Sequence, residues 1–261
     1  MWLRISALVL RQLYLYRRST ARLMEIFFWP VINLLVWGFV TLYLQRIALP
    51  KAVVFLLGVM ILFDVLYRSQ QAITLSITEE FWVKNIINIF ITPVRMVELL
   101  LANCLVGILK SVATTIFLGL LAYALYAFNV MEIGWALLPF FLSLLLFGWA
   151  MGMLTMSLIL RYGHAAEAFI WGVPFLLQPI SAVFYPVDVL PGWLQKVAYA
   201  LPSTYVFEGM RRVLSTGSAD WAGLFFSLAL NLVYLAGGSA VLGWMLNNVR
   251  RKGYLSRLQM E

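Results

Sequence analysis

The sequence predicts an all-α integral membrane protein with six transmembrane helices, and two observations carry this prediction. Of 261 residues, 63% are hydrophobic and only 11% are charged, whereas a soluble domain has about 45–50% apolar and about 25% charged residues. The apolar residues also gather in runs of about 20, the length of a helix that crosses a bilayer. We expect residues 1–261 to form one membrane domain without a sizeable soluble domain.

Residues 1–22 predict an amphipathic helix that lies on the membrane surface. Arg4, Arg11 and Arg18 share one helical face, while apolar side chains between Trp2 and Tyr16 occupy the opposite face. An interfacial helix of this kind turns its arginines toward anionic lipid head groups. The segment is too basic for the apolar core of a signal peptide, so we expect no cleavage.

Six apolar segments follow, separated by short turns and polar stretches. The predicted spans run near residues 24–45, 52–74, 97–127, 135–160, 165–186 and 221–246. Most of the 19 Lys and Arg residues lie in segments that share a side with the N-terminus. The positive-inside rule therefore predicts a multi-pass protein of the inner (plasma) membrane with both termini in the cytoplasm.

The polar segment 76–91 predicts a short cytoplasmic helix between the second and third spans. Ser76 and Glu79 have the spacing of a capping box, so the helix is expected to begin there. Glu79 and Glu80 would then lie in its first turn, where the helix dipole favours negative charge.

One face of this helix carries Trp82, Ile86 and Ile89, with Asn85 beside them, and Pro93 marks its end. Such a helix lies on the bilayer surface or docks against another protein. A surface helix without a special role is the alternative.

The segment 187–219 predicts two short re-entrant helices on the outer side, near residues 194–201 and 205–214. Irregular backbone at membrane depth survives only where protein or a water-filled cavity surrounds it. A re-entrant hairpin at an exit gate meets this condition, and an ordinary extracellular loop is the alternative. The candidate gate residues are Pro186, Asp188, Pro191, Pro202, Glu208 and Arg211.

Three ionisable residues, Asp64, Arg68 and Lys110, fall inside predicted spans. Intramembrane charges are functional candidates by default. The structural alternative is that Asp64 and Arg68, four residues apart, form a pair along one helix. Lys110 would then snorkel or pair with a neighbouring acid.

Aromatic residues make up 15% of the chain, and many lie near the predicted ends of spans. That placement is typical of an interfacial aromatic belt. Alternatively, Trp37, Tyr43, Phe184 and Tyr185 line a path for a large amphiphilic or sugar-bearing substrate.

Motifs for catalysis are absent from the sequence. The segment from Gly107 to Ser111 lacks the glycine that a phosphate loop has before its lysine. One His and one Cys cannot build a metal site, and no basic tail or RNA-type motif points to nucleic acid. We therefore expect no enzyme activity and no cofactor in this chain.

Several segments together resemble the permease subunits of type-2 ABC exporters over nearly the whole chain. They are the amphipathic start, Glu79-Glu80 through Phe90 to Thr92-Pro-Val-Arg95, Tyr185-Pro-Val-Asp188, Leu190-Pro191, Leu201-Pro202 and Glu208 to Arg211. Residues 79–93, EEFWVKNIINIFITP, differ from the commoner form of this segment in the family, which has glutamates, a glycine and a run of leucines.

The resemblance implies a dimer of two such permeases, most simply a homodimer, with two ATP-binding subunits that hold ATP and Mg²⁺. It also implies that residues 78–91 form a coupling helix in a cleft of the ATPase. The coupling residues would be Glu79, Glu80, Trp82, Asn85, Ile86, Ile89 and Phe90. ATP binding would push the coupling helices together, and the first and fifth spans would part to admit a glycan, lipid or drug-like substrate.

Two other classes remain open. A secondary transporter driven by an ion gradient would need no ATPase and would depend on Asp64. A membrane-bound enzyme acting on lipids would use His164 and Glu167, which lie three residues apart and can touch across one helical turn.

Overall fold

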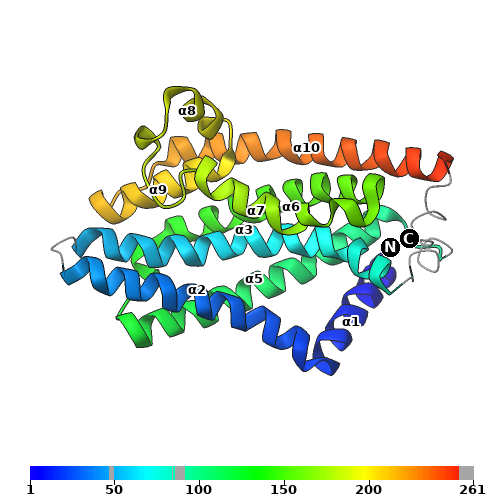
Figure 1. Cartoon of the computed structure of the whole chain (residues 1–261), viewed down its shortest axis with the longest axis horizontal. Helices are drawn as coiled ribbons and strands as arrows, with labels where there is room; N and C mark the ends of the chain where they lie inside the picture. The colour runs from blue at the N-terminus through cyan, green and yellow to red at the C-terminus, as the bar shows by residue number, and fades with distance from the viewer. Residues whose placement is uncertain (47–49, 84, 86–91, 253–261) are drawn as a thin grey trace.

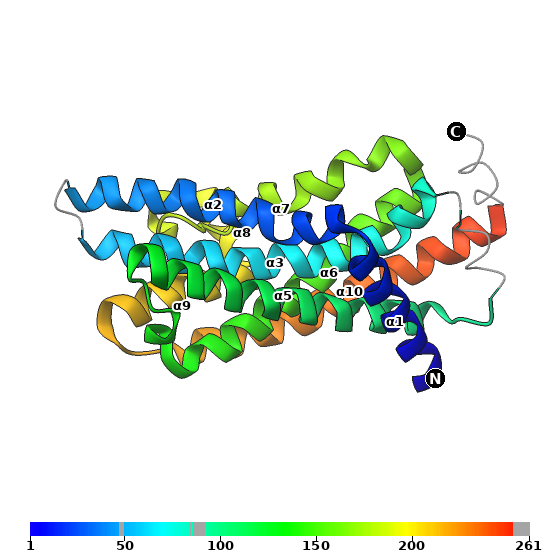
Figure 2. The same ribbon diagram turned by 90° about the horizontal axis from the view of Figure 1, so that it is seen from below.

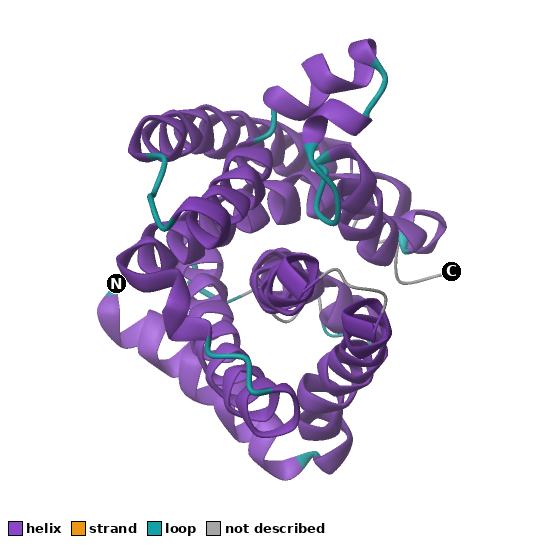
Figure 3. Cartoon of the chain, turned by 90° about the vertical axis from the view of Figure 1, so that its left-hand side faces the viewer, coloured by secondary structure: helices purple, strands orange, loops and turns teal. Residues whose placement is uncertain are grey.

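The computed structural model describes residues 1–46, 50–83, 85 and 92–252, and all regular structure in this part of the chain is helical (Figures 1 and 3). The long helices are α2 (Thr20–Arg46), α3 (Pro50–Trp82), α5 (Met96–Tyr126), α6 (Leu137–Tyr162) and α10 (Trp221–Lys252). The shorter elements are α1 (Trp2–Arg18), η1 (Val130–Ala136), η2 (Gly163–Ala166), α7 (Ala168–Ile180), η3 (Val187–Val189), α8 (Gly192–Tyr199) and α9 (Pro202–Thr216). The predicted all-α class agrees with this architecture.

Helix α3 is the central helix of the bundle. Its most apolar stretch is 89% buried, against 17% for α2 and 22% for α10, and it packs against α2, α5 and α6. Two glycines of α6 allow the closest of these contacts. A Cβ on Gly148 would lie 2.7 Å from the carbonyl oxygen of Leu66, and one on Gly152 would lie 2.8 Å from that of Gln70. Small residues are typical where membrane helices approach so closely.

The start of α1, the end of α3, η2 and the end of α10 lie at the same end of the bundle (Figure 1). We call it the terminal end. Helix α1 turns away from α2 at Ser19 and crosses the bundle there, against α5 (Figure 2). The described ends of the chain and the turns after α3 and α6, which the prediction puts on one side of the membrane, therefore gather at one end.

Helix α3 corrects the predicted boundary between the second span and the cytoplasmic helix. It runs without interruption through Ser76, so no helix begins there. The hydroxyl of Ser76 donates to the carbonyl oxygen of Ile73 at 2.6 Å, as serines inside helices do. Glu79 and Glu80 consequently lie in the last turn of α3 rather than in a first turn. Most of the remaining predicted helix, residues 84 and 86–91, lies outside the described residues.

Five helical segments of the described chain are long and apolar enough to cross a membrane, one fewer than predicted. The exception is the predicted span 165–186. Its helix, α7, ends at Ile180 after 13 residues, which extend about 20 Å, less than the roughly 30 Å of a bilayer core.

Helices α7 and α9 together return the chain along the bundle. Helix α7 leaves the terminal end, and α9 continues toward the opposite end, where α10 begins (Figure 1). Residues 181–201, with η3 and α8, are inserted between them. Two helices, α8 and α9, therefore occur where the pair was predicted, but α9 is buried against α6 and α10 and continues the return of the chain along the bundle.

Candidate functional site

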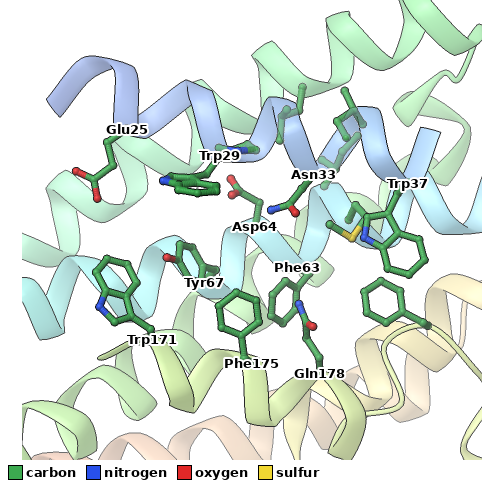
Figure 4. A pocket seen from close by; sticks show the side chains of 16 residues that line it. Glu25, Trp29, Asn33, Trp37, Phe63, Asp64, Tyr67, Trp171, Phe175 and Gln178 are labelled. Carbon is green, nitrogen blue, oxygen red and sulfur yellow. The ribbon is translucent and has the colours of Figure 1, made fainter. Parts of the chain in front are cut away.

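A cavity of about 580 Å³ lies between α2, α3 and α7 (Figure 4). Aromatic side chains from all three helices and from the segment after α7 form most of its wall. They include Trp29, Trp37, Tyr67, Trp171, Phe175 and Phe184. The volume and the apolar lining are those of a site for a small organic molecule.

Two of the four aromatic residues predicted on sequence to line a path are in this wall. Trp37 and Phe184 stack with ring centroids 4.4 Å apart and planes 14° from parallel. Tyr43 and Tyr185 are not among the residues that line the cavity. The hydroxyl of Tyr185 instead donates to the carbonyl oxygen of Pro179 at 2.9 Å.

Four polar side chains, Glu25, Asn33, Asp64 and Gln178, interrupt the aromatic wall. The predicted pair is present: Arg68 Nε donates to Asp64 Oδ2 at 3.0 Å. Arg68 also donates to the backbone carbonyl of Ile26, which ties α3 to α2. One carboxylate of the wall is thus neutralised within the protein.

The other wall residues of the cavity were not predicted from the sequence as residues of a path. Trp29, Asn33 and Trp37 are four residues apart on α2, while Trp171, Phe175 and Gln178 share a face of α7. Aromatic and amide side chains sharing one face of an apolar helix were the available signal. That the face of α2 and the face of α7 line the same cavity follows only from the packing of the helices in the structure.

Ion pairs fix the end of α3 to α1 and α2 at the terminal end. Arg22 lies 2.8 Å from Glu79, and Arg11 lies 2.6 Å from Glu80. Glu80 is 4% exposed, so Arg11 compensates a buried carboxylate. These carboxylates also lie at the negative end of the α3 dipole, which makes the arginines necessary.

Helix α1 thus uses its arginines differently from the prediction. Arg4 donates to the carbonyl oxygen of Pro93 at 2.7 Å and lies 3.5 Å from Glu98. Together with Arg11, it binds protein carboxylates rather than only lipid head groups. Glu98 also accepts the backbone N–H of Arg95 at 2.8 Å, which caps the start of α5.

Trp82 joins the end of α3 to η2. Its indole Nε1 donates to Glu167 Oε1 at 2.7 Å, and His164 Nδ1 lies 2.5 Å from the same oxygen. The predicted contact between His164 and Glu167 is therefore present, but as part of a bridge from the end of α3 to the turn between η2 and α7. Asn85 donates to Glu80 at 2.7 Å. Ile86, Ile89 and Phe90 lie outside the described residues.

Lys110 forms no ion pair among the described residues and instead contacts Tyr16. Its ammonium donates to the hydroxyl of Tyr16 and lies 4.1 Å from the centre of that ring. Burial raises the pKa of Tyr16 to about 12, and Glu79 acts in the same direction. A neutral Tyr16 thereby anchors the end of α1 to α5.

The candidate gate residues converge on the irregular segment after α7. Arg211 of α9 donates to the backbone carbonyls of Ala182, Val183 and Tyr185, at 3.2 Å for Val183 and 2.5 Å for Tyr185. Glu208 lies 2.9 Å from Arg211 and accepts the N–H of Val187 at 2.8 Å. Unpaired backbone groups are costly in an apolar environment, and these two side chains satisfy them.

The three prolines of the gate set begin elements. Pro186 precedes η3, Pro191 precedes α8, and Pro202 is the first residue of α9. Asp188 lies in η3, where its carbonyl oxygen, not its carboxylate, accepts a 3.4 Å hydrogen bond from Gln195. Of the gate set, only Glu208 and Arg211 therefore hold the segment through their side chains.

A model of the family described as ABC-2 family transporter protein matches residues 42–246 of the chain. The match extends from the end of α2 into the last third of α10 and includes the gate residues and the α7 wall of the cavity. No curated protein matches the chain.

Proposed function

Because the chain belongs to the ABC-2 transporter family and is a multi-pass membrane protein, we propose that it is the permease subunit of an ATP-driven exporter. Two separate ATP-binding subunits hold ATP and Mg²⁺ and perform hydrolysis, and this chain is not an enzyme. A second copy of the chain completes the path as a homodimer. The protein lies in the inner (plasma) membrane, with its terminal end on the cytoplasmic side.

The cavity between α2 and α7 supports a substrate path at this position. Glu25 lies on the first turns of α2, near the terminal end, and the stacked Trp37 and Phe184 lie further along the bundle. A substrate entering from the cytoplasmic side meets the carboxylate first and the stacked rings last. Separation of α2 from α7 would open the cavity, and separation of Trp37 from Phe184 would release its contents.

The observation that carries the proposal is the apolar surface exposed where α3 ends at the terminal end. Trp82 is 48% exposed and Val83 is 64% exposed. The turn just before them is fixed by the ion pairs of Glu79 and Glu80. An ATPase that grips this apolar surface therefore moves α1, α2 and α3 together. Buried aromatic and aliphatic anchors carry most of the energy of such interfaces.

Replacement of Trp82 by Arg tests this coupling. Arginine retains a donor for Glu167 but places a charge on the apolar surface. We expect Trp82→Arg to reduce co-purification of the ATP-binding subunit by about tenfold or more, and to abolish transport. The matched control is Trp135→Arg, because Trp135 is 92% exposed in η1, which joins α5 to α6 at the opposite end of the bundle (Figure 1). Undiminished co-purification and transport in the Trp82 variant would refute the assignment.

A further inference from the structure

The large cavity has acidic and aromatic walls without a basic side chain. Among its described lining residues the ionisable acids are Glu25 and Asp64, and none is Lys, Arg or His. We propose that the cavity binds a lipophilic organic cation of drug size. This inference rests on the proposed function, because it names the class of substrate that the permease carries.

Glu25 supplies the charge for this recognition. Its side chain is exposed and lies at one end of the cavity (Figure 4). Among the described residues, no hydrogen bond or ion pair to it is found. Asp64, by contrast, has one oxygen engaged by Arg68. An unpaired carboxylate beside an apolar chamber attracts a cation and repels an anion.

The aromatic wall supplies the second part of the recognition. The indoles of Trp29 and Trp171 and the ring of Tyr67 lie around the same end of the cavity as Glu25 (Figure 4). Cations bind over the faces of such rings, and quaternary ammonium groups are recognised by aromatic cages of this composition. Phe175 and the stacked Trp37 and Phe184 then enclose the apolar remainder of the ligand.

Basic side chains do occur nearby, but none of them lines the cavity. A smaller pocket of about 60 Å³ adjoins the cavity and shares Glu25, Trp29, Tyr67 and Trp171 with it. Its cations are Arg22, paired with Glu79, Arg68, paired with Asp64, and Lys110, bound to Tyr16. Tyr16 is neutral and does not balance the charge of Lys110, but Lys110 is not among the residues that line the cavity. An anionic ligand, such as a phosphate-bearing glycan or lipid, therefore finds no cation in the wall of the cavity itself.

The size of the cavity agrees with this class. A volume of about 580 Å³ lies within the range of roughly 300–1,000 Å³ that sites for drug-sized ligands occupy. An oligosaccharide of many units would not be enclosed. A compact cation with several aromatic or alkyl groups fills such a chamber and places its charge against Glu25.

Tetraphenylphosphonium and tetraphenylborate provide the test, because they match in size and shape and differ in the sign of their charge. Binding of each ion to the full chain in lipid nanodiscs is measured by equilibrium dialysis, with protein-free nanodiscs as the background. We expect saturable binding of the cation and at least tenfold weaker binding of the anion. Neither ATP nor the ATP-binding subunit is present in this measurement.

Three variants assign the binding to the cavity. Glu25→Gln should weaken cation binding by about tenfold, and Trp171→Leu should also weaken it. Glu132→Gln makes the same carboxylate-to-amide change on an exposed residue of η1 and should leave binding unchanged. Thermal unfolding of each variant verifies that the fold is retained.

Equal affinity for the two ions, or unchanged cation binding in Glu25→Gln, would overturn the inference and leave a chamber for lipid chains alone. Failure of the proposed function looks different. In that case the cation still binds with the expected variant pattern, but no ATP-binding subunit co-purifies with the chain.

Discussion

Arg211 satisfies three backbone carbonyls that the end of α7 leaves without helical partners. Its side chain is 15% exposed and lies against Glu208, while its guanidinium also covers the ring of Phe55 at 4.7 Å. A guanidinium has five N–H donors in a fixed plane, so one residue can hold an irregular segment that otherwise needs water. This side chain therefore holds the irregular backbone between α7 and α9.

Replacement of Arg211 by Met should therefore destabilise the protein by about 3 kcal/mol, because it leaves a carboxylate and several carbonyls unpaired. The measurement is thermal unfolding in detergent. Arg212→Met is the matched control: Arg212 is 57% exposed and pairs with Asp220 at the surface, so a cost below about 1 kcal/mol is expected. Equal costs for the two variants would contradict this role of Arg211.

Asp64 and Arg68 show how the same charges support different interpretations at the residue scale. The sequence placed both inside a predicted span, where an ion-coupled transporter would use an acid. In the structure Arg68 engages Asp64 and the carbonyl of Ile26, so the pair holds α2 against α3. A structural pair of this kind does not favour ion coupling over the ATP-driven function.

At the scale of elements, the ion pairs of α1 are the feature that the sequence did not reveal. The seven-residue spacing of Arg4, Arg11 and Arg18 predicts one basic face, and α1 has that face. Whether it meets lipid or protein depends on where α1 crosses the bundle. That crossing brings Arg11 to Glu80, a residue 69 positions later in the chain.

Reversal of the Arg11 charge tests the attachment of α1. Arg11→Glu should release α1 from α3, because two carboxylates would then face each other with Glu80 buried. Faster hydrogen–deuterium exchange of the amides of residues 2–18 is the expected result. The double variant Arg11→Glu with Glu80→Arg should restore protection.

Arg18 offers the control for this experiment, because it is an exposed arginine of the same helix. Arg18→Glu should leave the exchange rates of α1 unchanged. If Arg11→Glu also leaves them unchanged, the ion pair does not hold the helix.

Local patterns predicted the long helices better than their boundaries. Runs of apolar residues indicated α2, α3, α5, α6 and α10, because burial in a membrane needs only length and hydrophobicity. The S-x-x-E spacing at Ser76 failed because a helix interior accommodates the same residues: Ser76 donates back to Ile73, and Arg22 stabilises Glu79. The division of the fifth crossing between α7 and α9 depends on Arg211, a contact over 26–29 residues.

The residues of the candidate site were predicted only in part. Trp37 and Phe184 were identified as path residues, whereas Glu25, Trp29 and Trp171 were not. Each of these three is unremarkable in its own helix, as a charge or an indole near the end of a span. They form one wall only because α2 and α7 lie on either side of the same cavity, next to α3.

For the whole molecule, the contacts that join the end of α3 to its neighbours lie together at one end of the bundle. The ion pairs of α1 and α2, the bridge from Trp82 to Glu167 and the exposed Val83 all lie at the terminal end. The cavity begins near the same end and is closed further along by Trp37 and Phe184. We therefore expect a push on the end of α3 to move α2, one wall of the cavity, with it.

The central claim is that a cytosolic ATPase grips this chain where α3 ends. Site-specific photo-crosslinking in the membrane tests it most directly, with the photoreactive residue at Val83 and, as a control, at Trp135 on the opposite end. The account predicts that Val83 crosslinks to an ATP-binding subunit and that Trp135 does not. Absence of that crosslink at Val83, or labelling of Val83 only from outside the cell, would contradict it.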